Sequence, residues 1–453
     1  MFYLSKDREL TPDLLFKMIN HFQLVVVPKL ERYKNYYDGV QDILQKSYTD
    51  ESKPCNKTVI NYCKNITDSY NGYMATPGHI AYNSEQDIED IMDILRYNDY
   101  QTEDSDFLHD ALVHGIAHEL MYIDTDAKTR FKLINPLTCF GIYDNSLTAD
   151  LLYFVRFYKV NDWDDKDMEY AVDVYTDTSI KHYTMQGINA VPAFIKEEPH
   201  YFGQCPANIF ALPDEKSIFD CIMSEQDSVN ELLSAEIDDY AAFCDAYLVI
   251  EDAEMDEETV KTMKSNRVLQ LPVGAKAYWL TKAANDAQVE NILKRLHESI
   301  YREAQCPDFS SESFIGGVSS GIAIQYRLTG METRAGGIEA LMKKALQRRI
   351  EILCGVASLK LGEEVYRDIE ITFTRNIPAD EAALVNLINS LKGTVSDETL
   401  LGLLPFIPDV QKELEKVKAQ KESNMDLFGG NLFDSSESES QEEETDEETN
   451  MDE

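Results

Sequence analysis

The sequence predicts an α+β, mainly helical protein built from several structural units. Its 453 residues are 43% hydrophobic, which is enough apolar material for most of the chain to fold. A chain of this length is too long to fold around one compact core. Several long stretches repeat apolar residues at helical spacing. One central region instead carries short β-branched and aromatic runs separated by turn residues, which is typical of strands.

The N-terminal part is predicted to be helical. Pro12 follows Thr11, so a helix N-cap with proline in the first turn is expected there. Pro77 and Gly78 end a later helical pattern. The predicted helical stretches are residues 12–46, 56–75, 86–99 and 104–118.

The pattern changes near residue 119, and from there to about 212 we expect an antiparallel β region. The segments are short, rich in β-branched and aromatic residues, and separated by turn residues. They are ELMYID (119–124), KLINPL (132–137), FGIYD (140–144), LLYFVRFYKV (151–160), YAVDVYTD (170–177) and IKHYTM (180–185).

Two long amphipathic helices with a small β insert are expected next. Residues 214–246 predict a helix of about 30 residues, roughly 45 Å long. Residues 286–305 predict the second helix. Between them, YLVIED (247–252) and RVLQLPV (267–273) are predicted strands on either side of an acidic helical turn at 256–265.

Residues 307–321 form a Ser- and Gly-rich segment that is predicted to be a loop. A third long helical pattern follows over 322–355. Gly330, Gly336 and Gly337 interrupt its first half, and each costs about 1 kcal/mol relative to alanine in a helix. We therefore expect a kink or a break in this helix.

The C-terminal part predicts one strand, a small helical unit and a disordered tail. The strand is YRDIEITFTRNIP (366–378), and the helical unit spans 379–421. Residues 422–453 are acidic and Ser-rich, a composition that cannot bury enough apolar surface to fold.

The formal net charge is −40, and it is not confined to the tail. Residues 426–453 hold twelve Asp or Glu and no Lys or Arg, so −28 falls on residues 1–425. A body this acidic argues against binding nucleic acid through a general basic surface. Two explanations remain open: acidity that keeps a soluble protein from aggregating, or a surface that tolerates DNA without holding it.

The eight cysteines are scattered and form no CxxC pair, which indicates reduced thiols in a cytosolic setting. The N-terminal residues lack the apolar core of an export signal. No run of 18 apolar residues occurs, so no membrane-spanning segment is expected.

The sequence lacks the spacing that common catalytic and ligand-binding motifs require. His114 and His118, with Glu119 beside them, do not have HExxH or HxxEH spacing and lack a third metal ligand, so a structural histidine pair is expected. The glycines of 316–321 precede no GK[ST], which argues against a phosphate-binding loop. No GxSxG nucleophile motif appears. We therefore expect no enzyme activity, no cofactor and no metal.

Five stretches occur in an order that resembles the portal proteins of tailed bacteriophages, of the siphophage type. They are YKNYYDG (33–39), NKTVINY to GYMATPG (56–78), LINPLTCFGIYD (133–144), SEQDSVNELLSAEIDDYAAFCDAYLVI (224–250) and DFSSESFIGGVSSGIAIQYRLTGME (308–332). In the last stretch the matching positions are Asp308, Phe314, Gly317, Ser320, Gly321, Ala323, Leu328, Gly330 and Glu332.

This resemblance implies a ring subunit with a wing, a stem, a clip and a small helical crown. The implied units are residues 1–213 (first part of the wing), 214–246 (stem helix), 247–285 (clip), 286–306 (stem helix), 307–321 (tunnel loop), 322–378 (long kinked helix and second part of the wing), 379–425 (crown) and 426–453 (disordered acidic tail).

The tunnel loop is the implied DNA-facing site. Duplex DNA binds Lys and Arg strongly through its phosphates, so a loop along which DNA must slide should be small and not basic. Residues 307–321 meet this condition, although an ordinary connector between helices would also fit. The DNA-facing residues would be Asp308, Phe309, Ser310, Ser311, Glu312, Ser313, Phe314, Ile315, Gly316, Gly317, Val318, Ser319, Ser320 and Gly321.

One basic concentration, Lys343, Lys344, Arg348 and Arg349, could contact DNA or an acidic neighbouring subunit. Lys344 and Arg348 share a helical face. The alternative is a solvated face paired with acidic neighbours such as Glu339 and Glu351.

The resemblance implies a channel for packaging and ejecting double-stranded DNA at one vertex of the capsid. It implies a homo-oligomeric ring of twelve subunits in the virion, assembled in the cytoplasm of the bacterial host. Its expected partners are the terminase large subunit, which supplies ATP hydrolysis, a head-completion (adaptor) protein, and the major capsid and scaffolding proteins. Two alternatives remain: an acidic interaction or scaffold protein that acts through its tail, and a metal-dependent nucleic-acid enzyme.

Overall fold

A computed structural model describes most of the chain, in two units that are treated separately: residues 1–380 and 381–453. The described residues are 2–49, 53–160, 169–243, 247–251, 261, 273–280, 286–311, 314, 321–356, 365–376, 388–402, 404, 410 and 413–420. The fold is α+β, as the sequence predicts. None of the helices in these ranges is long and apolar enough to cross a lipid bilayer.

The N-terminal helices form near their predicted positions. The side chain of Thr11 accepts a hydrogen bond from the Leu14 backbone N–H at 3.4 Å, which confirms the predicted N-cap. One π-helical turn separates the first two helices. The helices are α1 (Pro12–His21), α2 (Val27–Asp38), α3 (Tyr62–Met74), α4 (Glu89–Tyr97) and α5 (Tyr100–His114), with the π turn at Phe22–Val26.

The prediction of a helix over 104–118 is wrong at its C-terminal end. Gly115 caps α5 with a φ of +81°, a left-handed conformation that favours glycine. A Cβ at Gly115 would also lie 2.5 Å from the backbone of Glu215. The chain therefore leaves the helix at this point and enters strand β3 (Ile116–Ile123).

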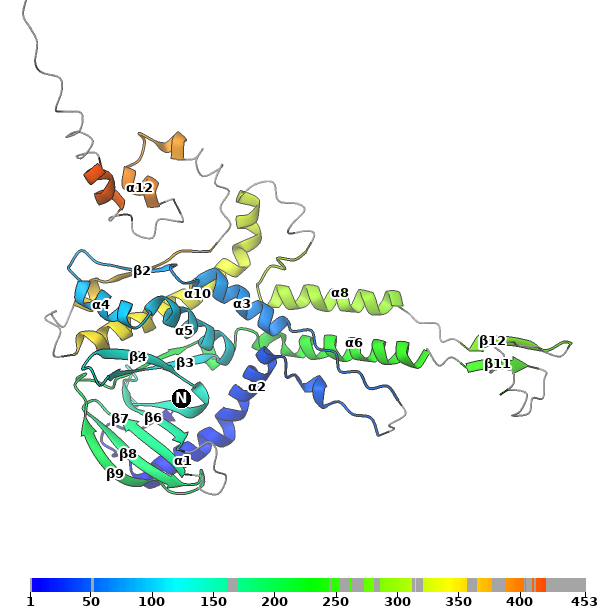
Figure 1. Ribbon diagram of the computed structural model, residues 1–453, viewed down its shortest axis with the longest axis horizontal. Coiled ribbons are helices and arrows are strands. Elements are labelled where there is room, and N and C mark those ends of the chain that lie inside the picture. Colours follow the sequence, from blue (N-terminus) through cyan, green and yellow to red (C-terminus); the bar gives the residue numbers. More distant parts are fainter. Residues whose placement is uncertain are drawn as a thin grey trace, which may run out of the picture. The chain divides into compact units, whose positions relative to one another are not determined.

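Two sheets form the predicted β region (Figure 1). One has six strands in the order β1-β5-β6-β7-β8-β9, with β1 parallel to β5 and every other pair antiparallel. The other is antiparallel, in the order β10-β3-β4. The bounds are β1 (Phe2–Tyr3), β4 (Thr129–Ile134), β5 (Cys139–Tyr143), β6 (Leu151–Lys159), β7 (Glu169–Tyr175), β8 (Ser179–Gln186), β9 (Ala193–Pro199) and β10 (Ala207–Ala211).

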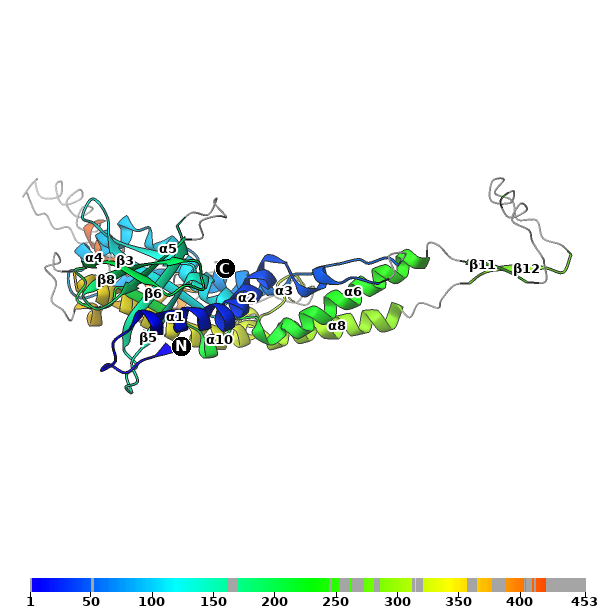
Figure 2. The same cartoon turned by 90° about the horizontal axis from the view of Figure 1, so that it is seen from below.

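Helices α6 (Met223–Phe243) and α8 (Asp286–Glu303) pack side by side, as both views show (Figures 1 and 2). The chain between them carries the hairpin of β11 (Tyr247–Glu251) and β12 (Lys276–Leu280). The prediction for 214–246 was too long, because residues 213–222 contain two 3₁₀ turns. The second strand is KAYWL; of the predicted RVLQLPV strand, residues 267–272 lie outside the described residues.

Helix α10 (Gly321–Cys354) is continuous over 34 residues, so the expected break is absent. Figure 1 shows its ribbon changing direction between the yellow-green and the yellow part. A short antiparallel pair, β2 (Ile80–Asn83) with β13 (Glu370–Phe373), confirms a strand within 366–378.

The larger hydrophobic core lies among α3, α5, α8 and α10, and a second core lies between α1, α2 and the six-stranded sheet. In the second unit, α12 (Asp397–Gly402) and a helical stretch at 413–420 agree with the predicted helical character of 379–421. Residues 421–453, which include the predicted disordered tail, lie outside the described residues.

The prediction that residues 56–61 begin a helix is also wrong, because they form an extended strap along α6. Four buried polar side chains of α6 form a polar ladder that accepts hydrogen bonds from every second backbone N–H of residues 56–62. The N–H of Asn56 donates to Asp238 (2.6 Å), Thr58 to Ser234 (2.9 Å), Ile60 to Asn230 (3.0 Å) and Tyr62 to Gln226 (3.0 Å).

The spacing of the polar ladder follows from two backbone geometries. Two residues of extended chain rise about 6.6 Å, and four residues of α-helix rise about 6.0 Å. Donors at every second strap residue therefore stay level with acceptors at every fourth residue of α6. The match leaves each of these four partly buried strap amides paired.

Replacing Asn230 by alanine should release the strap locally. The partly buried Ile60 N–H would lose its acceptor, and the buried side chains of Gln41 and Gln226 would lose their hydrogen bonds to Asn230, at a combined cost of about 1–3 kcal/mol. Amide hydrogen exchange of residues 58–62 should accelerate about tenfold or more, since 1.4 kcal/mol corresponds to a factor of ten. Ser228→Ala, on the exposed face of the same helix, is the matched control and should leave this exchange unchanged. Equal exchange in both variants would contradict the role of the polar ladder.

Candidate functional site

The candidate site is the start of the 307–321 loop, where α8 ends. The hydroxyl of Tyr70 donates to the carbonyls of Ala304 (3.0 Å) and Gln305 (3.1 Å). Arg334 of α10 also donates to the Ala304 carbonyl, at 2.8 Å. The last carbonyls of a helix have no partner within the helix. Tyr70 and Arg334 therefore terminate α8 and fix the direction in which the loop departs.

Asp308 holds the first turn of this loop. Its carboxylate accepts hydrogen bonds from the backbone N–H (3.0 Å) and the hydroxyl (2.6 Å) of Ser310. Its other oxygen lies 3.0 Å from His297 Nε2 of α8, and His297 Nδ1 lies 3.0 Å from the hydroxyl of Tyr62. Partial burial raises the pKa of Asp308, but the hydrogen bonds from Ser310 and His297 outweigh it and hold the pKa below its usual range. The carboxylate therefore stays ionised near neutral pH.

Two phenylalanines in the described part of the loop are also held in place by contacts. The rings of Phe309 and Phe314 meet edge to face with centroids 5.1 Å apart, and Arg327 of α10 donates to the Phe314 carbonyl at 3.2 Å. The remaining predicted loop residues, Glu312, Ser313, Ile315, Gly316, Gly317, Val318, Ser319 and Ser320, lie outside the described residues. Their role as a DNA-facing surface stays a prediction.

Of the four basic residues predicted as a possible contact, three are at least partly exposed, and the fourth, Arg349, is buried. Lys343 pairs with Glu339 at 2.8 Å and Arg348 with Glu351 at 2.6 Å, as the ion-paired alternative expects. Lys344 and Arg348 line one side of a surface hollow beside β10. A contact of these three residues with DNA or with a neighbouring subunit stays a prediction.

The prediction that Arg349 contacts DNA or a neighbouring subunit is wrong, because its side chain is 0% exposed. Its guanidinium forms two 2.9 Å contacts with the Glu119 carboxylate and a third ion pair with Asp104. Tyr82 donates to the other oxygen of Asp104 at 2.7 Å. Burial alone would lower the pKa of Arg349, but Glu119 and Asp104 raise it well above its ordinary value. Arg349 is therefore a charged internal crosslink between α10, α5 and β3.

His114 and His118 do not share a helical face. His114 ends α5 and its Nδ1 lies 3.1 Å from the Asp110 carbonyl oxygen. His118 lies on β3, with its ring centroid 5.7 Å from that of Phe154. Burial lowers the pKa of His118 to about 3 and that of His114 to about 4, so both rings are neutral at pH 7. Among the described residues, no group of three or more His, Cys, Asp or Glu side chains is arranged to hold a metal ion.

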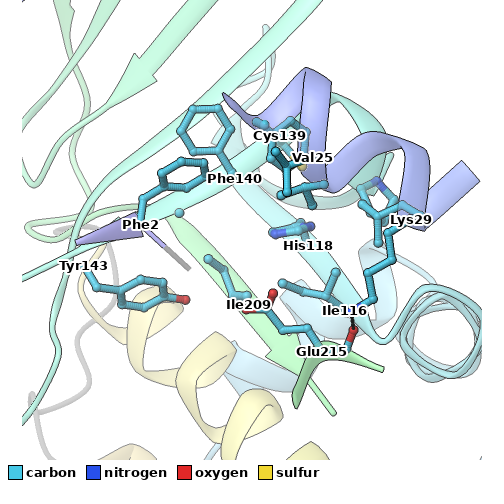
Figure 3. A pocket seen from close by; sticks show the side chains of 15 residues that line it. Phe2, Val25, Lys29, Ile116, His118, Cys139, Phe140, Tyr143, Ile209 and Glu215 are labelled. Carbon is cyan, nitrogen blue, oxygen red and sulfur yellow. Dashed lines mark hydrogen bonds between the residues drawn. The ribbon is translucent and has the colours of Figure 1, made fainter. Parts of the chain in front are cut away.

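A cavity of about 180 Å³ lies between the π turn, β5 and β10 (Figure 3). Its walls are mostly apolar, and the imidazole of His118 lies among side chains that include Val25, Phe140 and Ile209. Lys29 Nζ donates to the Glu215 carbonyl oxygen at 2.7 Å at its edge. Within the described residues, Nδ1 of the neutral His118 ring has no hydrogen-bond partner.

Sequence reasoning missed the residues that anchor the loop: Tyr62, Tyr70, His297 and Arg334. They come from three helices, α3, α8 and α10, that are distant in sequence. The four-residue spacing of His297 and Tyr301 on α8 was a usable signal for a shared aromatic face, and Tyr62 contacts both rings. No local pattern indicates that this face meets Asp308.

Replacing Arg349 by methionine should destabilise the protein strongly. Asp104 and Glu119 would remain buried without a cation, and breaking a buried pair in this way costs about 3–5 kcal/mol. Arg348→Met is the matched control, since its pair with Glu351 is one third exposed and should contribute about 1 kcal/mol or less. Urea unfolding of both variants measures the difference. Equal losses would show that the internal crosslink does not carry the stability assigned to it.

Comparison with known proteins places this architecture in a family. The family model described as "Phage portal protein, SPP1 Gp6-like" matches residues 17–426. The chain is 20% identical to a portal protein of Bacillus phage SPP1, over 94% of this chain and 87% of that protein. It is 21% identical to a portal protein of Clostridium phage phiCD119, over 86% of this chain and 93% of that protein. The chain therefore belongs to the SPP1 Gp6-like family of phage portal proteins, structural components of the virion capsid through which the viral genome is packaged.

Proposed function

We propose that this chain is one subunit of a closed ring of twelve copies at one capsid vertex, and that double-stranded DNA passes through the central channel. What supports the ring is the antiparallel pair α6 and α8, which has a β hairpin at one end and the 307–321 loop at the other. The acidic charge of the chain suits a conduit, because it gives DNA phosphates no general basic surface to bind.

In this proposal each segment has a place in the ring. Helices α6 and α8 form the stem, the hairpin between them lies in the clip, residues 307–321 form the tunnel loop, and the sheets with α10 form the wing. Residues 379–425 form a crown and residues 426–453 an acidic tail. The clip would receive the terminase large subunit during packaging and a head-completion protein afterwards, while the wing would meet capsid and scaffolding proteins. The subunit itself performs no catalysis.

Electron microscopy of the purified chain tests the ring. Uniform rings with a central hole are expected, and a stable monomer at micromolar concentration would contradict the proposal. Deletion of residues 422–453 separates it from the scaffold alternative: a portal subunit should still form rings, whereas a scaffold that acts through its tail would lose its function.

A basic substitution in the 307–321 loop should slow DNA passage without affecting assembly. Glu312→Lys places a cation where the loop is proposed to meet phosphates, and each such contact releases counterions and adds salt-sensitive binding. Rings should form normally, while DNA packaged per capsid should fall and recover partly at higher salt. Glu312→Gln is the matched control, which removes the acid without adding a cation. Identical packaging by the two variants would count against the loop as a DNA-facing element.

A further inference from the structure

The cavity beside His118 is separate from the 307–321 loop and from the two stem helices, and the proposed channel does not use it (Figure 3). Its volume is about 180 Å³. An apolar cavity of about 150 Å³ in another protein holds one benzene molecule. The space beside His118 therefore suits a single six-membered ring with a small substituent.

His118 places a polar ring inside this mostly apolar cavity. The residue is 2% exposed, and its imidazole lies among the lining side chains. Because burial lowers its pKa to about 3, the ring is neutral and offers one N–H donor and one nitrogen acceptor. No residue in the described part of the chain hydrogen-bonds to either ring nitrogen. Buried polar groups normally have a partner, so this ring indicates one that comes from outside the chain.

The backbone at one wall of the cavity is held in an uncommon conformation. Asp214 and Glu215 have φ angles of +57° and +50°, in the left-handed region that residues other than glycine seldom adopt. Lys29 of α2 donates to the Glu215 carbonyl at 2.7 Å, and Gly115 has no side chain to keep this backbone away. Strain of this kind persists where the surrounding structure fixes it, and it clusters at ligand sites.

Another wall of the cavity is the π turn, Phe22–Val26. Single π-helical turns are rare and frequently occur at functional sites. Val25 lines the cavity and is also 57% exposed, so it borders both the cavity and the solvent. Its neighbour Leu24 is 71% exposed and does not line the cavity.

We propose that this cavity binds one small, mostly apolar ring compound that carries a hydroxyl or N–H group, and that this group hydrogen-bonds to His118. The walls favour the ring because its apolar surface leaves water, and the imidazole selects the polar substituent. Water alone fits less well, because a buried water typically makes about three hydrogen bonds and the walls are mostly apolar. The inference is independent of the proposed ring of subunits.

Equilibrium dialysis of the full chain against phenol, in sealed cells, tests this site. Toluene is the matched probe, since it has nearly the same shape and lacks the hydroxyl. One phenol per chain should bind. His118→Leu should still bind toluene, but its preference for phenol over toluene should fall about three- to tenfold, the factor that one net hydrogen bond contributes. An unchanged preference would overturn the role of His118.

Two substitutions in the π turn locate the bound phenol. Val25 and Leu24 are adjacent and exposed, so Val25→Trp and Leu24→Trp should both fold. Val25→Trp should fill the cavity and weaken phenol binding at least about tenfold, whereas Leu24→Trp should leave it unchanged. Equal binding by the two variants, several phenol molecules per chain, or no saturable binding at millimolar phenol would each overturn the proposal.

Urea unfolding distinguishes a ligand-binding imidazole from a structural one. Without ligand, His118→Leu should unfold at the same urea concentration as the unaltered chain or at a higher one, because it removes a buried polar group that has no partner. Phenol should raise the midpoint of the unaltered chain and leave that of Val25→Trp unchanged. A clearly lower midpoint for His118→Leu without ligand would assign the ring to the stability of the fold and contradict the proposed site.

Discussion

Buried hydrogen-bond donors must be paired, and this constraint fixes α6 within the fold. The four amides of residues 56–62 that face α6 are partly buried, and they would lose their hydrogen-bond partners on an apolar helix face. They lie instead on Gln226, Asn230, Ser234 and Asp238, one acceptor for each donor. The agreement between two extended residues and four helical residues sets the register of strap and helix. A shift by one residue would break all four bonds together, so the position of α6 is tightly specified.

Tyr62 transmits this register to the loop. Its backbone N–H ends the polar ladder on Gln226, while its hydroxyl contacts His297 of α8, which in turn holds Asp308. Tyr70 and Arg334 fix the carbonyls immediately before the loop. The start of the 307–321 loop is thus positioned by the strap, by both stem helices and by α10. In the proposed ring, this connection would hold twelve loops at the same height around the DNA.

Features that depend on residues close in the sequence were predicted, whereas features that depend on contacts between distant residues were not. The strands between 119 and 186, helix α8 and the N-cap at Thr11 depend on local periodicity, and all were predicted. The strap, the burial of Arg349 and the anchoring of Asp308 depend on partners more than 100 residues away or on other helices. Arg349 is one residue from the ion-paired, partly exposed Arg348, and nothing local distinguishes the two.

By itself the sequence determined the α+β class, the two amphipathic helices with a β insert between them, the acidic character of the whole chain and the family resemblance. These follow from residue spacing, composition and motif order, which do not require the fold to be known. Only the tertiary structure decided which polar residues turn inward and where α5 gives way to β3. Burial and pairing are properties of the assembled fold, because each depends on what the rest of the chain places beside a residue.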